Sequence, residues 1–482
     1  MPKVGGVVLE SGSDRPLEGV RISVAPDSTT VAVTDSAGAF SIEALNPGRF
    51  RIVPSKEGFV YARPARLQIP REPGVWVQVP ASGSIEDLEL RMEREGVIVG
   101  TVLGANGRPV YTGSVGAVLR TFDKTGNLGI EAVLGGKVND QGAYRIFGLQ
   151  RGDYYLRVIG APQGILSRTY YPGTPDLERA TLIRVNPGEE ARVGPIYVQP
   201  ITTADVRFHF EDDKSVPGIR NLTLSDDVLV SAAPHDQDNF VVSGLISGDY
   251  AGLLSLSTPS GLAYSRFELN VGNSTVDMDV TMRPGLRTSG RVILEDASGS
   301  RLAPPEIKCQ LRSRSAGHYL PDRTRGCIGA QLAPGSYWLE MQGMPADAYV
   351  RSVSGSGKDL LPLGNFDIEQ DIELNIVVTS PGGVIRGNAE DSNGQKLGDA
   401  IVALIPDAPL RSSGLLYRSA VTDSQGNFEL RGIAPGAYHL FAWQELNGAA
   451  YHNADFIKEF DERGLAVHIE GETSLTVNIT TF

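Results

Sequence analysis

The chain has 482 residues, of which 41% are hydrophobic, and its 44 basic and 57 acidic residues give a net charge of −13. Such a length implies several domains, because a single domain usually holds about 100–200 residues. No run of Lys or Arg stands out, which argues against nucleic acid as a partner, since phosphate binding needs a concentrated basic face.

Membrane-spanning and export signals do not stand out either. No apolar run approaches the roughly 20 residues of a membrane-spanning helix. The N-terminal apolar stretch from Val4 to Leu9 is shorter than the roughly 7–15 residues of a signal-peptide core, and Glu10 follows at once. Two interpretations are open: a cytoplasmic protein, or an exported protein whose signal lies outside this chain.

One phrase recurs along the chain. TDSAGAFSIEALNPGRFRIVP (residues 34–54) returns as TDSQGNFELRGIAPGAYHLFA (residues 422–442). In each copy an aromatic residue is followed, ten residues later, by a second aromatic that closes a Pro-Gly turn or a variant of it. Four copies hold both aromatics: Phe40 and Phe50, Tyr144 and Tyr154, Phe240 and Tyr250, and Phe428 and Tyr438. A fifth copy ends at Tyr337, and Cys327 takes the place of its first aromatic.

The spacing of the copies predicts a repeat of whole domains. The turn glycines are Gly48, Gly152, Gly248, Gly335 and Gly436, which lie 104, 96, 87 and 101 residues apart. Solenoid repeats are shorter, at roughly 20–50 residues.

Each phrase predicts a strand, a turn and a second strand. Asp35 begins a turn, because a short Asp side chain can bond the backbone two residues on while a nearby Gly takes positive φ. Phe40-Ser41-Ile42 then alternates apolar and polar residues, which is typical of a half-buried strand. After the Pro-Gly turn, residues 49–53 return as the second strand.

The rest of each repeat is also predicted to be strand. Period-2 alternation marks residues 20–24, 276–282, 372–378 and 475–479. Strands of this kind, separated by turns about every 8–12 residues, indicate an all-β sandwich. Two short helices are expected, one capped by Thr174 and one over residues 455–461.

We therefore predict an all-β chain of five tandem Greek-key β-sandwich domains. The predicted domains are residues 1–95, 96–200, 201–285, 286–382 and 383–482. The second to fourth domains end at Pro or Gly residues (Pro200, Gly285 and Gly382), and the linkers are short. Such linkers favour an ordered string of domains over freely tumbling ones, so we expect an elongated array.

Domain one resembles a known family. Its stretches GGVVLESGSDRPLEGVRISV (residues 5–24) and TDSAGAFSIEALNPGRFRIVPSKEGF (residues 34–59) are similar to the carboxypeptidase regulatory-like domain. Domain two (GVIVGTVLGANGRPV) and domain five (GGVIRGNAEDSNGQKLGDAIVAL) also match, whereas domains three and four match only in the second half of the pattern.

The resemblance implies a transthyretin-like (prealbumin-like) sandwich. Domains of this family occur beside metallocarboxypeptidase catalytic domains and in many bacterial surface and periplasmic proteins. Because related folds are classed with starch-binding modules, the resemblance also implies carbohydrate binding. The fold alone does not fix a function.

Catalytic motifs are not found in the sequence. A carboxypeptidase centre needs two His and a Glu as zinc ligands. The six His are scattered over three domains, none begins a His-x-x-Glu pair, and no Gly-x-Ser-x-Gly elbow occurs. The segment from Ser354 to Lys358 lacks the first Gly of a phosphate loop, and the turn at Asp423 is too short for a calcium loop. We therefore predict no enzyme activity, no metal and no cofactor.

Four aromatic residues near loops are candidate carbohydrate-stacking residues: Tyr170, Tyr171, Trp443 and Tyr451. Sugar rings stack on exposed aromatic faces. In the alternative interpretation, these rings plug the ends of the sandwich cores, since Tyr and Trp are often largely buried.

The two cysteines, Cys309 and Cys327, both lie in domain four. Cys327 takes an aromatic, core-facing place, and Cys309 shares a face with Ile307 and Leu311. Two inward cysteines on neighbouring strands predict a disulfide, which would close a loop of about 18 residues and contribute roughly 3 kcal/mol. The alternative is two buried free thiols.

These observations predict a non-catalytic, extracytoplasmic scaffold or binding protein (periplasmic, cell-surface or secreted). Its expected partner is a polysaccharide or another cell-envelope component, and its oligomeric state is left open. An alternative is an accessory part of a larger secreted peptidase or outer-membrane receptor. A third hypothesis, a hidden hydrolase, predicts a cleft with clustered His, Asp or Glu.

Overall fold

The computed structural model describes residues 3–25, 29–43, 48–62, 74–79, 84–111, 113–159, 169–198, 203–210, 220–224, 233–234, 239–258, 261–302, 307–315, 318–320, 326–423 and 425–482. Within these ranges the strands form ten sheets, two in each of the five segments that the sequence divides into domains. The all-β prediction is confirmed. The domain boundaries stay a prediction, and the one at Pro200 lies outside the described residues.

Domain one packs two four-stranded sheets face to face. The first contains, in order, β4 (Ala39–Ile42), β1 (Val4–Glu10), β8 (Ile85–Arg94) and β6 (Phe59–Tyr61), and the second β3 (Thr29–Val33), β2 (Arg21–Ala25), β5 (Gly48–Ser55) and β7 (Val75–Val79). Val8, Ile22 and Phe40 are part of one buried core between the sheets.

Domain two repeats this plan, but the hairpin formed by its β10 and β11 is longer than the matching hairpin of β2 and β3. One sheet contains β11 (Leu128–Lys137), β10 (Ser114–Phe122), β13 (Gly152–Ile159) and β14 (Ile183–Val185). The other contains β12 (Ala143–Leu149), β9 (Gly96–Gly104) and β15 (Glu190–Arg192), with β16 (Ile196–Val198) also paired to β9. The helix expected after Thr174 is a single 3₁₀ turn (Leu177–Arg179), and its cap is Asp176, whose side chain accepts from the Glu178 amide.

Domain three also holds two four-stranded sheets. One contains β19 (Ala233–Pro234), β20 (Asn239–Ile246), β17 (Thr203–Phe210) and β23 (Val276–Val280), and the other β18 (Arg220–Leu224), β21 (Gly248–Thr258), β22 (Gly261–Val271) and β24 (Arg283–Pro284). Phe208 and Phe267 meet in its core with ring centroids 5.2 Å apart.

Domain four has five strands in one sheet and four in the other. The first contains β28 (Gln331–Leu332), β25 (Leu286–Glu295), β33 (Ile372–Thr379), β30 (Tyr349–Gly355) and β31 (Lys358–Asp359). The second contains β27 (His318–Leu320), β26 (Lys308–Ser315), β29 (Gly335–Gln342) and β32 (Asn365–Ile368).

Domain five adds a helix to its sandwich. Its sheets contain β37 (Asn427–Ile433), β34 (Gly383–Glu390) and β40 (Ser474–Thr480), and β36 (Arg418–Val421), β35 (Ile401–Pro406), β38 (Gly436–Trp443) and β39 (Leu465–Ile469). The helix expected over residues 455–461 is shorter: α1 covers Ala454–Lys458, and a 3₁₀ turn (Asp461–Arg463) follows. Among the described residues, no helix has the length and apolar character needed to cross a membrane.

The five domains share one topology. The first strand of each domain pairs antiparallel with the first strand of the phrase and parallel with the last strand of its own sheet, as β1 does with β4 and β8. The second strand of the phrase belongs to the other sheet, as β5 does by pairing with β2. The Pro-Gly turn therefore carries the chain from one sheet to the other.

The recurring Tyr of the phrase closes this corner. The hydroxyls of Tyr154, Tyr337 and Tyr438 donate to the backbone carbonyl four residues earlier, at 2.9, 2.6 and 2.8 Å. A buried hydroxyl must find a partner, and here it satisfies a carbonyl that the turn leaves unpaired. Gly335 and Gly436 follow that carbonyl with φ of 149° and 152°, a region that favours glycine.

The Thr-Asp pair of the phrase joins neighbouring loops. The Thr34 hydroxyl accepts from the Val20 amide (2.9 Å) and donates to the Leu17 carbonyl (2.6 Å), and Thr422 makes the same two contacts in domain five. Asp35 accepts from the Ala37 and Ala39 amides, both at 2.9 Å. The phrase therefore recurs because each sandwich needs the same turn and the same corner.

The corner also contacts the preceding domain at three junctions. Arg151, in the corner of domain two, bonds Glu93 of domain one at 3.0 Å. Gln331, at the start of the domain-four corner, accepts from the Tyr264 hydroxyl of domain three at 2.7 Å. In domain five, Arg418 bonds both Gly432 of its own corner (2.6 Å) and the Ala348 carbonyl of domain four (3.4 Å).

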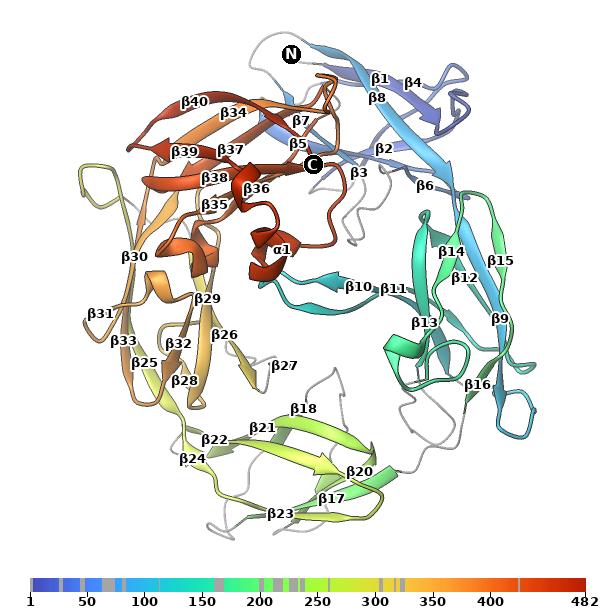
Figure 1. The fold of residues 1–482 in the computed structure, drawn as a ribbon, viewed down its shortest axis with the longest axis vertical. Helices are drawn as coiled ribbons and strands as arrows, with labels where there is room; N and C mark the ends of the chain where they lie inside the picture. Colours follow the sequence, from blue (N-terminus) through green and yellow to red (C-terminus); the bar gives the residue numbers. More distant parts are fainter. Residues whose placement is uncertain are drawn as a thin grey trace.

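The domains do not form an elongated array. In Figure 1 they lie around a ring, and the hairpin of β10 and β11 reaches domain five beside α1. Asn447 donates to the Arg120 carbonyl at 3.1 Å, across 327 positions of sequence. The expected extended arrangement is thus corrected: short linkers fix neighbouring domains, but a contact between distant domains bends the string back on itself.

Candidate binding cleft

A cavity of about 1100 Å³ lies where domains two, four and five meet. Domain two contributes the hairpin tip (residues 122–127), through Lys124, Thr125 and Asn127. Domain four contributes residues of β29, β30 and β32 and the loop after β29, and domain five contributes Arg431 and residues from within 411–418 and 451–457. We call this space the interdomain cleft. Its domain-two side is present only because the string of domains closes.

Aromatic rings form part of the wall of the cleft. Trp338 comes from β29, and Tyr417 and His452 come from two loops of domain five. The rings of Tyr417 and His452 are stacked, with centroids 4.4 Å apart and planes 25° apart. Tyr451 lies beside them, 4.7 Å from His452. Flat aromatic surfaces of this kind bind planar or ring-shaped ligands.

Hydrogen bonds hold these rings in place. The Tyr417 hydroxyl donates to the Arg411 carbonyl at 2.8 Å, and the Tyr451 hydroxyl contacts Ser419 Oγ at 3.1 Å. Burial raises the pKa of Tyr417 to about 12, so its hydroxyl stays protonated at neutral pH. Burial also lowers the pKa of His452 to about 4, against the opposing effect of Asp123, so the imidazole is neutral.

Two arginines of the cleft wall are already engaged. Arg411 forms an ion pair with Asp461. Arg418 donates to the carbonyls of Leu415 (3.0 Å) and Gly432 (2.6 Å), and burial lowers its pKa. Among the described residues, no group of three or more His, Cys, Asp or Glu is placed to hold a metal ion. The cleft therefore offers stacking surfaces and hydrogen-bonding groups.

The structure places the four candidate stacking residues in packed surroundings. Tyr170, Trp443 and Tyr451 are only 5%, 2% and 8% exposed, and Tyr171 packs against the core of domain two. Trp443 stacks on Phe441 at 5.6 Å. This burial fits the core-plugging interpretation, and of the four only Tyr451 lines the cleft.

Sequence reasoning missed Trp338, Tyr417 and His452. A signal for Trp338 was present, because it follows the buried Tyr337 on β29 and alternation turns it to the opposite face. Tyr417 and His452 belong to loops without a motif, and their meeting depends on tertiary structure.

Cys309 and Cys327 form a disulfide in the structure. Their Cα atoms are 5.3 Å apart, and both residues belong to the core of domain four. The bond joins β26 to the segment before β28, in the place that an aromatic ring fills in other domains.

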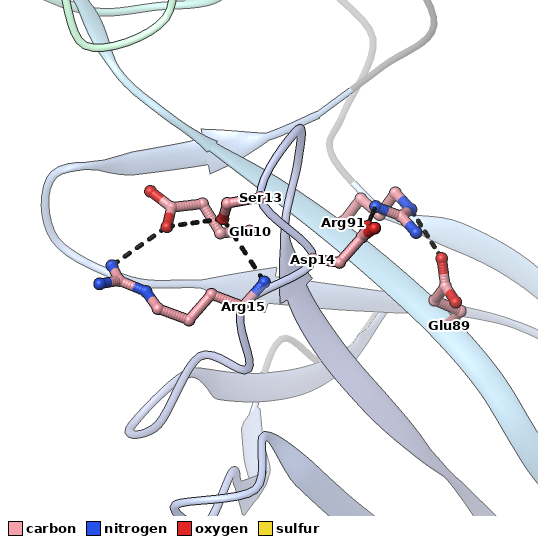
Figure 2. A network of polar contacts seen from close by, with 6 residues as sticks. All are labelled: Glu10, Ser13, Asp14, Arg15, Glu89 and Arg91. Carbon is pink, nitrogen blue, oxygen red and sulfur yellow. Dashed lines mark hydrogen bonds and ion pairs between the residues drawn. The ribbon is translucent and has the colours of Figure 1, made fainter.

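A charged network in domain one serves the fold. Arg91 of β8 contacts Asp14 at 2.5 Å and Glu89 at 2.6 Å, while Glu10 contacts Ser13 and Arg15 (Figure 2). Burial tends to raise the pKa of Glu10, but the hydrogen bond from Ser13 and the charges of Arg15 and Arg94 lower it overall. Exposed ion pairs each contribute little to stability. The main effect of these contacts is therefore to hold the loop after β1 in position.

Comparison with known families supports the resemblance for domain one. Residues 3–79 match the model of the carboxypeptidase regulatory-like domain. A search of curated proteins finds no match to the chain.

Among solved structures, three similar chains come from Bacillus and Streptococcus species. The TIE protein of Bacillus anthracis is 12% identical, with 99% of this chain and 67% of that chain covered and a TM-score of 0.17. The minor pilin GBS52 of Streptococcus agalactiae is 17% identical, with 42% and 97% covered and a TM-score of 0.21. BcpA, the major pilin subunit of Bacillus cereus, is 11% identical, with 80% and 99% covered and a TM-score of 0.15. At such TM-scores, the fold assignment rests on the sheets described above.

Proposed function

We propose that the chain is a non-catalytic, extracytoplasmic binding scaffold whose interdomain cleft binds carbohydrate. The observation that carries this proposal is the aromatic wall of the cleft, formed by Trp338, Tyr417 and His452. A pyranose ring presents an apolar face that stacks on an aromatic ring, and its hydroxyls bond polar groups around the ring. The match at residues 3–79 is to a regulatory-like domain, which agrees with a binding role.

A glycan array followed by calorimetric titration tests the proposal. The full chain should bind at least one class of polysaccharide fragment. Tyr417→Ala should weaken that binding about tenfold, because removing a stacking surface costs about 1.4 kcal/mol. Tyr197→Ala is the matched control, since Tyr197 is 45% exposed and lies outside the cleft lining. Equal binding by both variants, or binding to no glycan, would contradict the proposal.

The disulfide supports the extracytoplasmic part of the proposal. Structural disulfides persist in oxidising compartments and are rare in the cytosol. Mass spectrometry of the non-reduced protein, digested in acid, should show one peptide pair that links Cys309 to Cys327. Finding both residues only as separate, alkylatable peptides in protein from an oxidising compartment would remove this support.

A further inference from the structure

The contact between domains two and five is made mainly through backbone groups. Asn447 and Asn453 of domain five donate to the carbonyls of Arg120 (3.1 Å) and Gly126 (2.9 Å). The Ala449 amide donates to the Phe122 carbonyl at 3.0 Å. The Phe122 ring also lies 6.5 Å from the Phe456 ring of α1. Docking of the hairpin tip therefore depends on a small set of directional bonds and on the packing of Phe122 against the core of domain five.

Two glycines make the approach close enough for these bonds. A Cβ added to Gly126 would lie 2.4 Å from the backbone of His452. A Cβ added to Gly448, on the other side, would lie 2.3 Å from the Phe122 carbonyl oxygen. Because both obstacles are backbone atoms, a side chain at either position must push the two domains apart.

The hairpin tip is at once a docked element and a wall of the cleft. Asp123 fixes the shape of the tip by accepting from the amides of Thr125 (2.8 Å) and Asn127 (3.1 Å). Three tip residues line the cleft, and His452 touches the tip on one side and the cleft on the other. Moving the tip would therefore remove one side of the cleft and would expose the Phe122 ring, which packs against the core of domain five.

We propose that the hairpin tip is a gate of the interdomain cleft: its docking on domain five closes the cleft, and its release admits a ligand. The inference takes the cleft of the proposed function as the binding site. Domains that are distant in sequence and joined by a small contact are expected to move relative to one another. A ligand that touches both the tip and domain five binds the closed state better, so it holds the gate shut.

Substitution of glycine offers a matched test. Gly126 has φ of 77°, and Gly107, in another turn of domain two, has φ of 70°. Nothing lies within 4 Å of a Cβ added to Gly107. Gly126→Ala and Gly107→Ala therefore introduce the same backbone strain, but only the first forces the gate open.

Two measurements follow the gate without any ligand. Hydrogen exchange of the Ala449 amide reports docking, because this amide bonds Phe122. The maleimide labelling rate of a Met344→Cys background reports access, since Met344 lines the cleft and is partly buried. Gly126→Ala should raise both rates about fivefold or more, whereas Gly107→Ala should change neither. Unchanged exchange, or faster exchange with unchanged labelling, would overturn the gate.

Adding maltohexaose or cellohexaose separates this inference from the proposed function. A bound saccharide should slow the labelling of Met344→Cys in the otherwise native chain and should bind Gly126→Ala more weakly. If the two glycine variants differ as expected but neither saccharide protects Met344→Cys, the gate stands and glucan binding fails. If a saccharide binds while the two glycine variants behave alike, binding stands and the gate is overturned.

Discussion

Two kinds of interdomain contact hold this molecule together, and they differ in chemistry. Neighbouring domains meet through buried or multiply bonded side chains, such as Glu93, which is 2% exposed and receives three bonds from Arg151. Domains two and five, whose bond from Asn447 to Arg120 spans 327 positions, meet through amide groups, backbone carbonyls, two glycines and the Phe122 ring. Separating the first kind leaves a charge uncompensated, whereas separating the second exposes neutral groups that water can bond.

The two kinds of contact also differ in how readily they open. A buried carboxylate without its partner is costly, so the joint between domains one and two opens only at a large energetic cost. Neutral hydrogen bonds contribute about 0.5–1.5 kcal/mol each. The binding energy of a ligand is therefore large enough to open or close the contact between domains two and five. The cleft lies at the weaker of the two contacts, where binding energy can change the structure.

The largest effect is expected at the joint between domains four and five. Arg418→Ala should destabilise domain five by about 4 kcal/mol, because several partly buried carbonyls, including those of Gly432 and Ala348, lose a charged donor. Calorimetric unfolding of the full chain measures this loss. Arg431→Ala is the control, since Arg431 is exposed and pairs with Glu429 on the surface. Similar small changes in both variants would show that the joint is not the stronger contact.

A pH effect of about 3 kcal/mol is expected at the weaker contact. The pKa of His452 in the folded protein, about 4, lies below its ordinary value of 6.5, because burial opposes the charged form more than Asp123 favours it. The folded state then binds fewer protons than the unfolded state between these values. Stability is complete above pH 6.5 and is lost as the pH falls towards 4.

Thermal unfolding of domain five between pH 7 and pH 4 checks this dependence. His452→Gln should flatten the slope over that interval. His468→Gln should leave it unchanged, because the His468 side chain is 64% exposed and its charged neighbour, Glu470, is 84% exposed. Identical slopes for the two variants would assign the dependence to other groups.

The fold could be predicted from the sequence because its signals are local. Alternation along Phe40-Ser41-Ile42 and the turn at Asp35 depend on residues a few positions apart. The phrase's two strands join different sheets, and local alternation does not reveal this, since a turn between sheets and a hairpin turn can use the same residues. The Tyr438 hydroxyl, which bonds the Ala434 carbonyl across the corner, helps to fix the path between the sheets, and the sequence pattern did not reveal this bond.

The cleft could not be predicted, because it has no local signal. Its walls come from domains two, four and five, and the domain-two wall joins the others only when Gly126 approaches His452. Trp443 and Tyr451 were reasonable candidates as loop aromatics, but the phenylalanines around α1 fill the space in which Trp443 would have been exposed. Closure of the ring is a property of the whole chain, which short linkers alone do not indicate.

A smaller effect is expected within the corner itself. Tyr438→Phe should cost about 1–2 kcal/mol, because it leaves the Ala434 carbonyl buried without its donor. Calorimetry of the full chain measures the loss, and Tyr197→Phe, at an exposed site, is the control. A neutral result would mean that water or another donor satisfies the carbonyl, and that the recurring Tyr serves packing alone.

The smallest effect is expected at a single bond of the closing contact, where Asn453 has two roles. Its Oδ1 accepts from the Phe456 amide at 2.9 Å and caps α1, while its Nδ2 donates to the Gly126 carbonyl at 2.9 Å. Asn453→Asp keeps the cap, since Asp and Asn cap helices equally well, but replaces the donor with a second acceptor. Docking of the hairpin tip should weaken by about 1 kcal/mol.

Hydrogen exchange resolves the two roles in one experiment. In Asn453→Asp, the Ala449 amide should exchange about fivefold faster, because a loss of about 1 kcal/mol in docking raises the open population by that factor. The Phe456 amide should keep its native rate, since the cap persists. Asn453→Ala should accelerate both amides. If Asn453→Asp accelerates the Phe456 amide as well, α1 and the hairpin tip open together, and the contact is then part of the domain-five core.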